Sequence, residues 1–142
     1  MSDDVRKKQI IDIWAAAWDR GEVDALDGLL GPDYRRRSFP GDEGQSREEF
    51  KSSILATRSA FPALATTVDE IVADGDRVAV RWHSRGRHEG PFNGVPATHR
   101  TVDVDGATFA RFEDGLIVEE FVTWDPRALL TALGIITVGE DR

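Results

Sequence analysis

The sequence contains no cysteine and no long run of apolar residues. The absence of cysteine excludes disulfide bonds, thiolate metal sites and a cysteine nucleophile. No apolar stretch approaches the roughly 20 residues that a membrane-spanning helix requires. Positive charge is also scarce, because 18 Lys and Arg residues stand against 26 Asp and Glu, for a formal net charge of -8. That balance argues against nucleic acid as a partner.

The 142 residues are 40% apolar and 31% charged, which is typical of a globular protein. This length predicts one domain over residues 1–142. Residues 1–9 are charged and lack the apolar segment of a signal peptide, so a cytoplasmic protein is expected.

The first half of the chain is predicted to be mostly helical. Apolar residues recur at helical spacing over residues 3–20, and a shorter helix is expected over residues 23–30. A short strand over residues 33–38 follows. Ser46 and Glu49 then match a capping box that opens a further helix, which ends before Pro62.

The second half is predicted to be an antiparallel meander that ends in a helix. Strands are expected over residues 65–72, 77–88, 100–112 and 116–124, with Asp125 and Pro126 starting the final helix. Helices that precede an antiparallel sheet indicate the α+β class. A strongly twisted sheet can curl over such helices and leave a pocket between the two layers.

The alternation of side chains indicates which face of each strand is buried. Over residues 77–88 the predicted inner face carries Val78, Val80, Trp82, Ser84, Gly86 and His88, and the other face carries Arg77, Arg81, His83, Arg85 and Arg87. Both faces of residues 116–124 are partly apolar, which a second copy packed on the outer face would explain. A homodimer is therefore expected.

Several stretches of the second half resemble the SnoaL-like polyketide cyclase family, a branch of the fold named for nuclear transport factor two. The stretches that carry the resemblance are HEGPFNGVPAT at 88–98, RFEDGLIVEEF at 111–121, Trp124-Asp125, and LLTALG at 129–134. Near the N-terminus, Trp14, Trp18 and Gly21 fit the opening helices of the same fold. The sequence departs from the family pattern at His99 and Phe121, where the family usually has glycine and tryptophan, and at Arg111, near an expected histidine.

The resemblance implies a cone-shaped α+β barrel, with N-terminal helices packed on a strongly curved antiparallel sheet around an apolar pocket. It implies an enzyme that tailors aromatic polyketides without a cofactor, by closing a ring as an ester or aldol cyclase. One buried carboxylate can supply the general acid/base catalysis, because burial raises its pKa toward the working pH. Asp125 is the predicted carboxylate, and a helix N-cap is the alternative for it. His88 is predicted to polarise a carbonyl group, with a core histidine bonded to backbone as the alternative.

The predicted substrate is a polycyclic aromatic polyketide. The side chains expected to contact it are Trp14, Trp18, Tyr34, Phe50, Trp82, Phe92, His99, Phe109 and Phe121. The three histidines lie on different faces without ligand spacing, so no metal site is expected. The run from Arg35 to Arg37 is interpreted as a solvated strand edge.

Three alternatives to ring closure remain open at this point. A SnoaL-like hydroxylase would use the same pocket with altered polar residues, and an isomerase of the ketosteroid type would need the same buried aspartate. A non-catalytic protein that binds a small molecule in its pocket is the third alternative, because one fold hosts many functions.

Overall fold

A computed structural model describes residues 2–135 and shows helices packed on one face of a six-stranded sheet. The strand order is β2-β1-β6-β5-β4-β3. In chain order the elements are α1 Asp3–Trp14, η1 Ala15–Asp19, η2 Val23–Gly28, β1 Leu30–Arg37, β2 Gln45–Ser46, α2 Arg47–Ala60, β3 Ala65–Asp74, β4 Arg77–Arg87, β5 Thr101–Glu113, β6 Leu116–Trp124 and α3 Pro126–Ala132.

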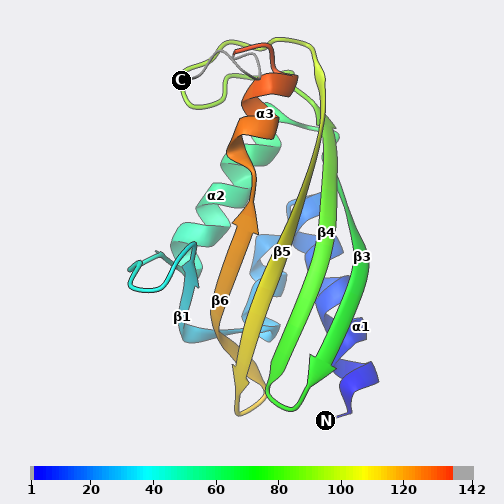
Figure 1. Ribbon diagram of the computed structural model, residues 1–142, viewed down its shortest axis with the longest axis vertical. Coiled ribbons are helices and arrows are strands. Elements are labelled where there is room, and N and C mark those ends of the chain that lie inside the picture. Colours follow the sequence, from blue (N-terminus) through cyan, green and yellow to red (C-terminus); the bar gives the residue numbers. More distant parts are fainter. Residues whose placement is uncertain (1, 136–142) are drawn as a thin grey trace.

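The predicted meander is confirmed, since β3, β4, β5 and β6 pair antiparallel in sequence order. Figure 1 shows the long strands curving together across α1 and α2, which lie behind the sheet. The sheet is open, because β2 and β3 form its two edges. The predicted α+β class and the curved sheet are therefore confirmed. The sheet is not wholly antiparallel, because β1 pairs parallel to β6.

The first predicted helix keeps its length but changes type along it, and the second helix is shorter than the sequence predicted. Helix α1 passes into a π-helical turn, η1, and Gly21 then reverses the chain with a φ of 72°. The next segment is only a short 3-10 helix, and the strand expected from residue 33 already begins at Leu30. Pro32 lies inside that strand, where the pairing with β6 is irregular between Leu30 and Arg35. A proline has no N–H to donate, so an irregular stretch accommodates it.

The capping box predicted at the start of α2 is confirmed. The Ser46 hydroxyl accepts a hydrogen bond from the Glu49 backbone N–H at 3.2 Å, and the Glu49 carboxylate accepts one from the Ser46 N–H at 2.9 Å. The helix buries Phe50 and Ile54 against the sheet. Within residues 2–135 no helix is long and apolar enough to cross a membrane.

A β-bulge in β6 decides which of its side chains face the helices. Arg111 of β5 pairs with Glu119, but the next residue, Phe112, pairs with Ile117, so Val118 is an extra residue in β6. An inserted residue shifts the alternation by one position. As a result Ile117 and Glu120 are both buried, at 1% and 2% exposure, although they are three residues apart in the sequence.

Candidate active site

A cavity of about 190 Å³ lies between the helices and the inner face of the sheet. Most of its wall is aromatic or aliphatic. The side chains that line it are Trp14, Trp18, Arg36, Phe50, Thr57, Phe61, Leu64, Thr66, Trp82, Ser84, Phe92, Val102, Val104, Thr108, Glu120, Trp124 and Leu129. Of these, Arg36 and Glu120 are the charged ones, so the chemistry of the cavity depends on this pair.

Glu120 is a buried carboxyl group in the cavity wall. The bulge in β6 turns it inward, and the Tyr34 hydroxyl on β1 donates a hydrogen bond to its Oε1. Burial raises the pKa of Glu120 above its usual value, while Arg36 and Tyr34 offset part of that rise. The pKa of Tyr34 is also raised, mainly by burial and further by Glu120, so this phenol keeps its proton. Glu120 can therefore exchange a proton, and Tyr34 remains a donor.

Arg36 supplies positive charge beside that carboxyl group. Its Nη1 lies 3.6 Å from Glu120 Oε1, and its guanidinium lies over the Phe50 ring, 4.3 Å from the ring centroid. Its side chain is 21% exposed, against 45% for Arg35, which pairs with Glu49. The interpretation of the arginine run as a solvated edge is therefore wrong for Arg36. A cation in an apolar wall stabilises negative charge that develops on a ligand oxygen.

Trp82 forms the wall of the cavity opposite the helices. Its indole N–H donates a hydrogen bond to Thr108 Oγ1 at 3.1 Å. The ring covers Gly106, its partner on β5, so closely that a Cβ there would lie 2.3 Å from Trp82 Cζ2. The inner face predicted for residues 77–88 is confirmed, because Val78, Val80 and Gly86 are buried and Trp82 and Ser84 line the cavity.

Only some of the nine aromatic and histidine residues predicted to contact a substrate line the cavity. Five of them line the cavity: Trp14, Trp18, Phe50, Trp82 and Phe92. Tyr34 is buried behind Glu120. Phe109 and Phe121 instead line a groove on the outer face of the sheet, with Phe109 53% exposed, so their predicted place in the pocket is wrong. Here β5 and β6 turn these residues away from the helices.

His99 and His88 differ sharply in their surroundings. His99 is exposed, has a φ of 60°, and its Nδ1 lies 3.2 Å from Glu89 Oε1, away from the cavity lining. His88 is fully buried, and its Nδ1 accepts the Thr98 backbone N–H at 3.1 Å. Its ring stacks on Phe61, with 5.3 Å between centroids, and its Nε2 is buried without a partner among the described residues. Phe61 lines the cavity, so His88 lies one ring behind the wall.

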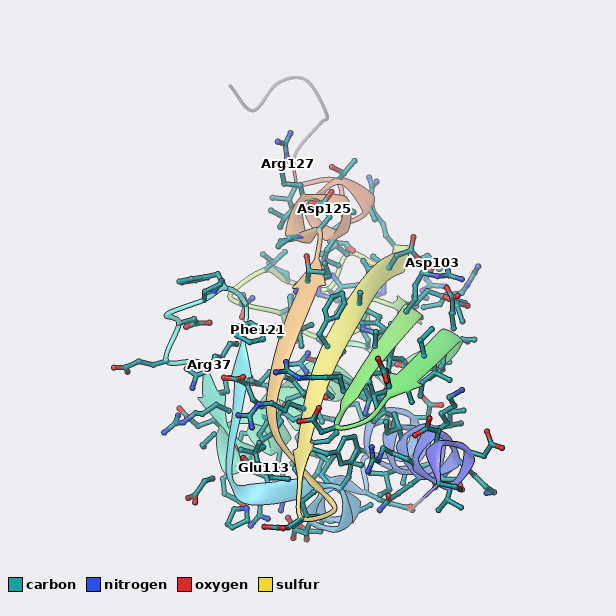
Figure 2. All side chains as sticks on the ribbon, turned by 60° about the horizontal axis from the view of Figure 1, so that its bottom comes forward. Arg37, Asp103, Glu113, Phe121, Asp125 and Arg127 are labelled. Atoms are coloured by element: carbon teal, nitrogen blue, oxygen red, sulfur yellow. The ribbon has the colours of Figure 1, made fainter. Side chains whose placement is uncertain are left out.

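Asp125 is exposed, contrary to the burial expected of it. Figure 2 shows it where β6 passes into α3, at the far end of the strand from the turn near Glu113. Its Oδ1 accepts the backbone N–H of Arg127 at 2.9 Å, and Pro126 follows as the first helical residue. Asp125 is thus the N-cap of α3, the alternative already open from the sequence.

A substitution measures how much this cap contributes. We expect Asp125→Ala to lower stability by about 1 kcal/mol, because the first turn loses a backbone partner, whereas Asp125→Asn keeps the cap and changes little. Thermal melting of the two variants checks the difference. An equal loss in both variants would mean that the carboxylate charge, and not the capping bond, stabilises this end of α3.

In the described part of the chain, no group of three or more His, Asp and Glu side chains is placed to hold a metal ion. Glu120 and Arg36 were not singled out from the sequence. The signal for Glu120 was present, because it alternates with Val118, Val122 and Trp124 on a largely apolar face.

Comparisons with known proteins agree with this architecture. AclR from Streptomyces galilaeus, described as a candidate hydroxylase, is 30% identical, with a TM-score of 0.84 over 95% of this chain and 99% of its own. TsrD from Streptomyces laurentii is 29% identical, with a TM-score of 0.84 over 96% and 100% of the two chains. IdmH from Streptomyces antibioticus, described as a candidate polyketide cyclase, is 30% identical, with a TM-score of 0.76 over 91% and 98%.

A search of curated proteins finds no match. The family model of the SnoaL-like polyketide cyclases, however, matches residues 8–133, which include every strand, helices α2 and α3, and the whole cavity wall. The resemblance seen in the sequence is thereby confirmed, and the chain belongs to the SnoaL-like polyketide cyclase family.

Proposed function

We propose that this protein closes a ring in an aromatic polyketide by intramolecular aldol condensation, with Glu120 as the acid/base group. The observation that carries the proposal is a carboxyl group, fully buried in an apolar cavity, that faces a phenol and a guanidinium. A raised pKa brings a carboxylate closer to the pKa that general base catalysis near neutral pH requires. The aromatic wall suits flat rings.

In the proposed reaction, the Glu120 carboxylate removes a proton from a carbon that lies between two carbonyl groups. The resulting enolate carbon attacks a ketone carbon of the same molecule, a C–C bond forms, and the ketone oxygen becomes an alkoxide. Protonated Glu120 returns the proton to that alkoxide. Atoms and charge balance without an external oxidant or reductant, and the product is an isomer of the substrate unless water is lost afterwards.

Arg36 and Tyr34 support these steps in different ways. Arg36 lies 3.6 Å from Glu120 and can stabilise the negative charge that develops on the enolate oxygen. Tyr34 donates to Glu120 and so orients its carboxylate. Helix α2 and the sheet hold the flexible chain of the substrate in a folded conformation against Phe50 and Trp82. Ring closure then costs less conformational entropy.

Asp125 and His88, the two groups predicted from the sequence, take other places in this proposal. His88 stacks on Phe61 and is proposed to position that ring in the cavity wall. Asp125 caps α3, whose Leu129 also lines the cavity. A direct role of Asp125 in proton transfer stays a separate prediction. The turnover of Asp125→Asn, compared with that of Glu120→Gln, tests it.

Similarity to AclR supports a second candidate function, hydroxylation of a polyketide. The same deprotonation by Glu120 gives a carbanion, which would add dioxygen to form a hydroperoxide. An external two-electron reductant, such as a reduced nicotinamide, would then cleave the O–O bond to leave the hydroxyl group and release the second oxygen atom as water. The assay that separates the two reactions incubates the purified protein with anthracycline-type keto acids and their methyl esters, in the presence of dioxygen and that reductant, and measures product mass. An isomer, or a loss of water or methanol, supports cyclisation, while a gain of one oxygen atom supports hydroxylation. Binding without turnover of any substrate would favour a pocket protein.

A homodimer is also proposed, through the uncovered outer face of the sheet. The outer groove of about 310 Å³ contains exposed Phe109 and half-buried Phe121. Arg111 and Glu119 flank these rings and pair with each other at 3.8 Å. In a two-fold arrangement the same patch of each copy meets itself, so a patch with both charges can complement its own copy. Figure 2 shows Phe121 beside Arg37 at this face.

We expect Phe109→Asp to convert the dimer to a monomer, because it places a charge in the centre of the apolar contact. Light scattering coupled to size exclusion measures the mass of each species. The matched control is Val5→Asp, at another exposed apolar residue, on α1, and it should leave the mass unchanged. A wild-type protein that is already monomeric at high concentration would contradict the proposal.

A further inference from the structure

A second hollow, here called the vestibule, adjoins the cavity at its charged end. It has a volume of about 290 Å³ and is lined by Arg36, Arg37, Ser38, Asp42, Gly44, Gln45, Val122 and Trp124. Arg36 and Trp124 belong to both hollows. The two differ in character, since aromatic rings dominate the cavity and polar side chains dominate the vestibule. A ligand that fills both must therefore have an apolar body and a polar end.

Two of the three charged residues of the vestibule are held by the protein itself. Arg37 Nε pairs with Glu119 at 2.9 Å, and its Nη1 donates to the backbone oxygen of Asp42. The Asp42 carboxylate accepts backbone N–H groups from Ser38 at 2.9 Å and from Gly44 at 3.0 Å. These contacts fix the loop between β1 and β2. They leave Arg36 as the cation placed to contact a ligand.

Arg36 retains donors for such a ligand. A guanidinium has five N–H donors, whereas its polar neighbours inside the cavity are Oε1 of Glu120 and the Tyr34 hydroxyl. The Glu120 contact is an ion pair at 3.6 Å, longer than a hydrogen bond. Stacking on Phe50 leaves the edges of the guanidinium available, and a planar fork of N–H groups matches a carboxylate.

We infer that the vestibule binds a carboxylate group of the substrate through Arg36, while the rings of the same molecule occupy the aromatic cavity. The substrate class is thus a polycyclic aromatic compound that carries a free carboxylic acid, in preference to its neutral ester. The inference rests on the proposed function only in placing the substrate in this cavity. It adds a residue that determines specificity, and it can be tested by binding alone.

The test compares an anthraquinone carboxylic acid with its methyl ester, using quenching of tryptophan fluorescence. We expect the wild-type protein to bind the acid about tenfold to a hundredfold more tightly than the ester. This is the affinity that a hydrogen bond between charged groups typically adds. Arg36→Met should remove this preference by lowering the affinity for the acid, with little change in the affinity for the ester. Arg36→Lys, which keeps the charge and loses the fork, should retain part of it.

Arg35→Met is the matched control, because Arg35 is the preceding residue of the same strand and lines neither hollow. It should keep the full preference for the acid. Melting curves of the variants show whether each is folded. Equal affinity of the wild-type protein for acid and ester, undetectable binding of the acid, or a preference that survives in Arg36→Met would overturn the inference. Because no turnover is measured, a failed aldol proposal would leave this result unaffected.

Discussion

Glu120→Gln is expected to abolish catalysis while leaving the protein folded. The amide has nearly the same shape and can still accept the Tyr34 hydrogen bond, but it cannot exchange a proton. Loss of general acid/base catalysis typically lowers rates by about 100-fold to 10,000-fold. The measurement is the kcat of the ring-closing reaction. Since the pocket keeps its shape, binding of an unreactive aromatic ligand should change little.

The stability of the wild-type protein relative to this variant depends on pH in a predictable direction. The pKa of Glu120 is raised in the folded protein, because burial disfavours its charged form. The folded state therefore binds more protons than the unfolded state once the pH exceeds the ordinary glutamate pKa, and stability falls as pH rises. This loss continues until the pH passes the raised, folded pKa. Relative to Glu120→Gln, the wild-type protein should be most stable in acid and lose that advantage across this window.

Asp125→Asn is the matched control for the catalytic experiment, because it also replaces a carboxylate by an amide, directly after the strand that carries Glu120. We expect it to keep turnover, since Asp125 is exposed and caps α3. If Asp125→Asn were inactive and Glu120→Gln active, the sequence-based choice of the base would be right and the geometric one wrong. Thermal melting of both variants in parallel excludes unfolding as the cause of any loss.

Local signals in the sequence predicted the elements that depend on local chemistry. The capping box of Ser46 and Glu49 fixed the start of α2, because both hydrogen bonds form within four residues. Strict alternation from Val78 to His88 identified the buried face of β4, since each side chain there faces one layer only. The turn glycines Gly75 and Gly115, both at positive φ, marked the ends of two hairpins.

Features that depend on pairing between distant strands could not be predicted in this way. The parallel pairing of β1 with β6 joins residues more than eighty positions apart, and no local pattern encodes it. The bulge at Val118 depends on how β5 and β6 meet, and it alone places Ile117 and Glu120 on one face. Glu120 lies beside this break. The alternation placed it on a largely apolar face, but both faces of this strand are partly apolar, so the sequence could not show that this face is the inner one.

The same reason explains the two misplaced phenylalanines. Phe109 and Phe121 are directly opposite each other in neighbouring strands, and both face away from the helices. Composition alone makes such aromatic residues candidates for a pocket, because they are more often buried than exposed. Their face is decided by register. An aromatic pair on an outer sheet face indicates a protein–protein interface more strongly than a ligand site.

Gly106→Ala is expected to displace the Trp82 ring, which forms one wall of the cavity, because the added methyl group would overlap with that ring. A Cβ at this position would lie 2.3 Å from Cζ2 and 2.6 Å from Cη2 of Trp82, far inside van der Waals contact. The indole must then swing away, and it loses its hydrogen bond to Thr108. Overpacking of this kind destabilises by about 1–3 kcal/mol. The displaced ring would also block the space that an aromatic ligand needs, so we expect binding to be lost.

Gly31→Ala provides the comparison, since it adds the same methyl group to a buried strand glycine whose nearest neighbour would be at 3.6 Å, an ordinary contact. Its melting temperature and its binding of an aromatic ligand should stay close to wild type. The tryptophan fluorescence of Gly106→Ala, to which all four tryptophans contribute, is compared with that of the control and read together with the melting curves. A changed spectrum in a protein that still melts cooperatively indicates a moved indole and not a general loss of structure. If Gly106→Ala bound ligand like the control, the Trp82 ring would not form the wall that the ligand meets. The apolar half of the site would then have to be assigned to the rings of Trp14 and Phe50 alone.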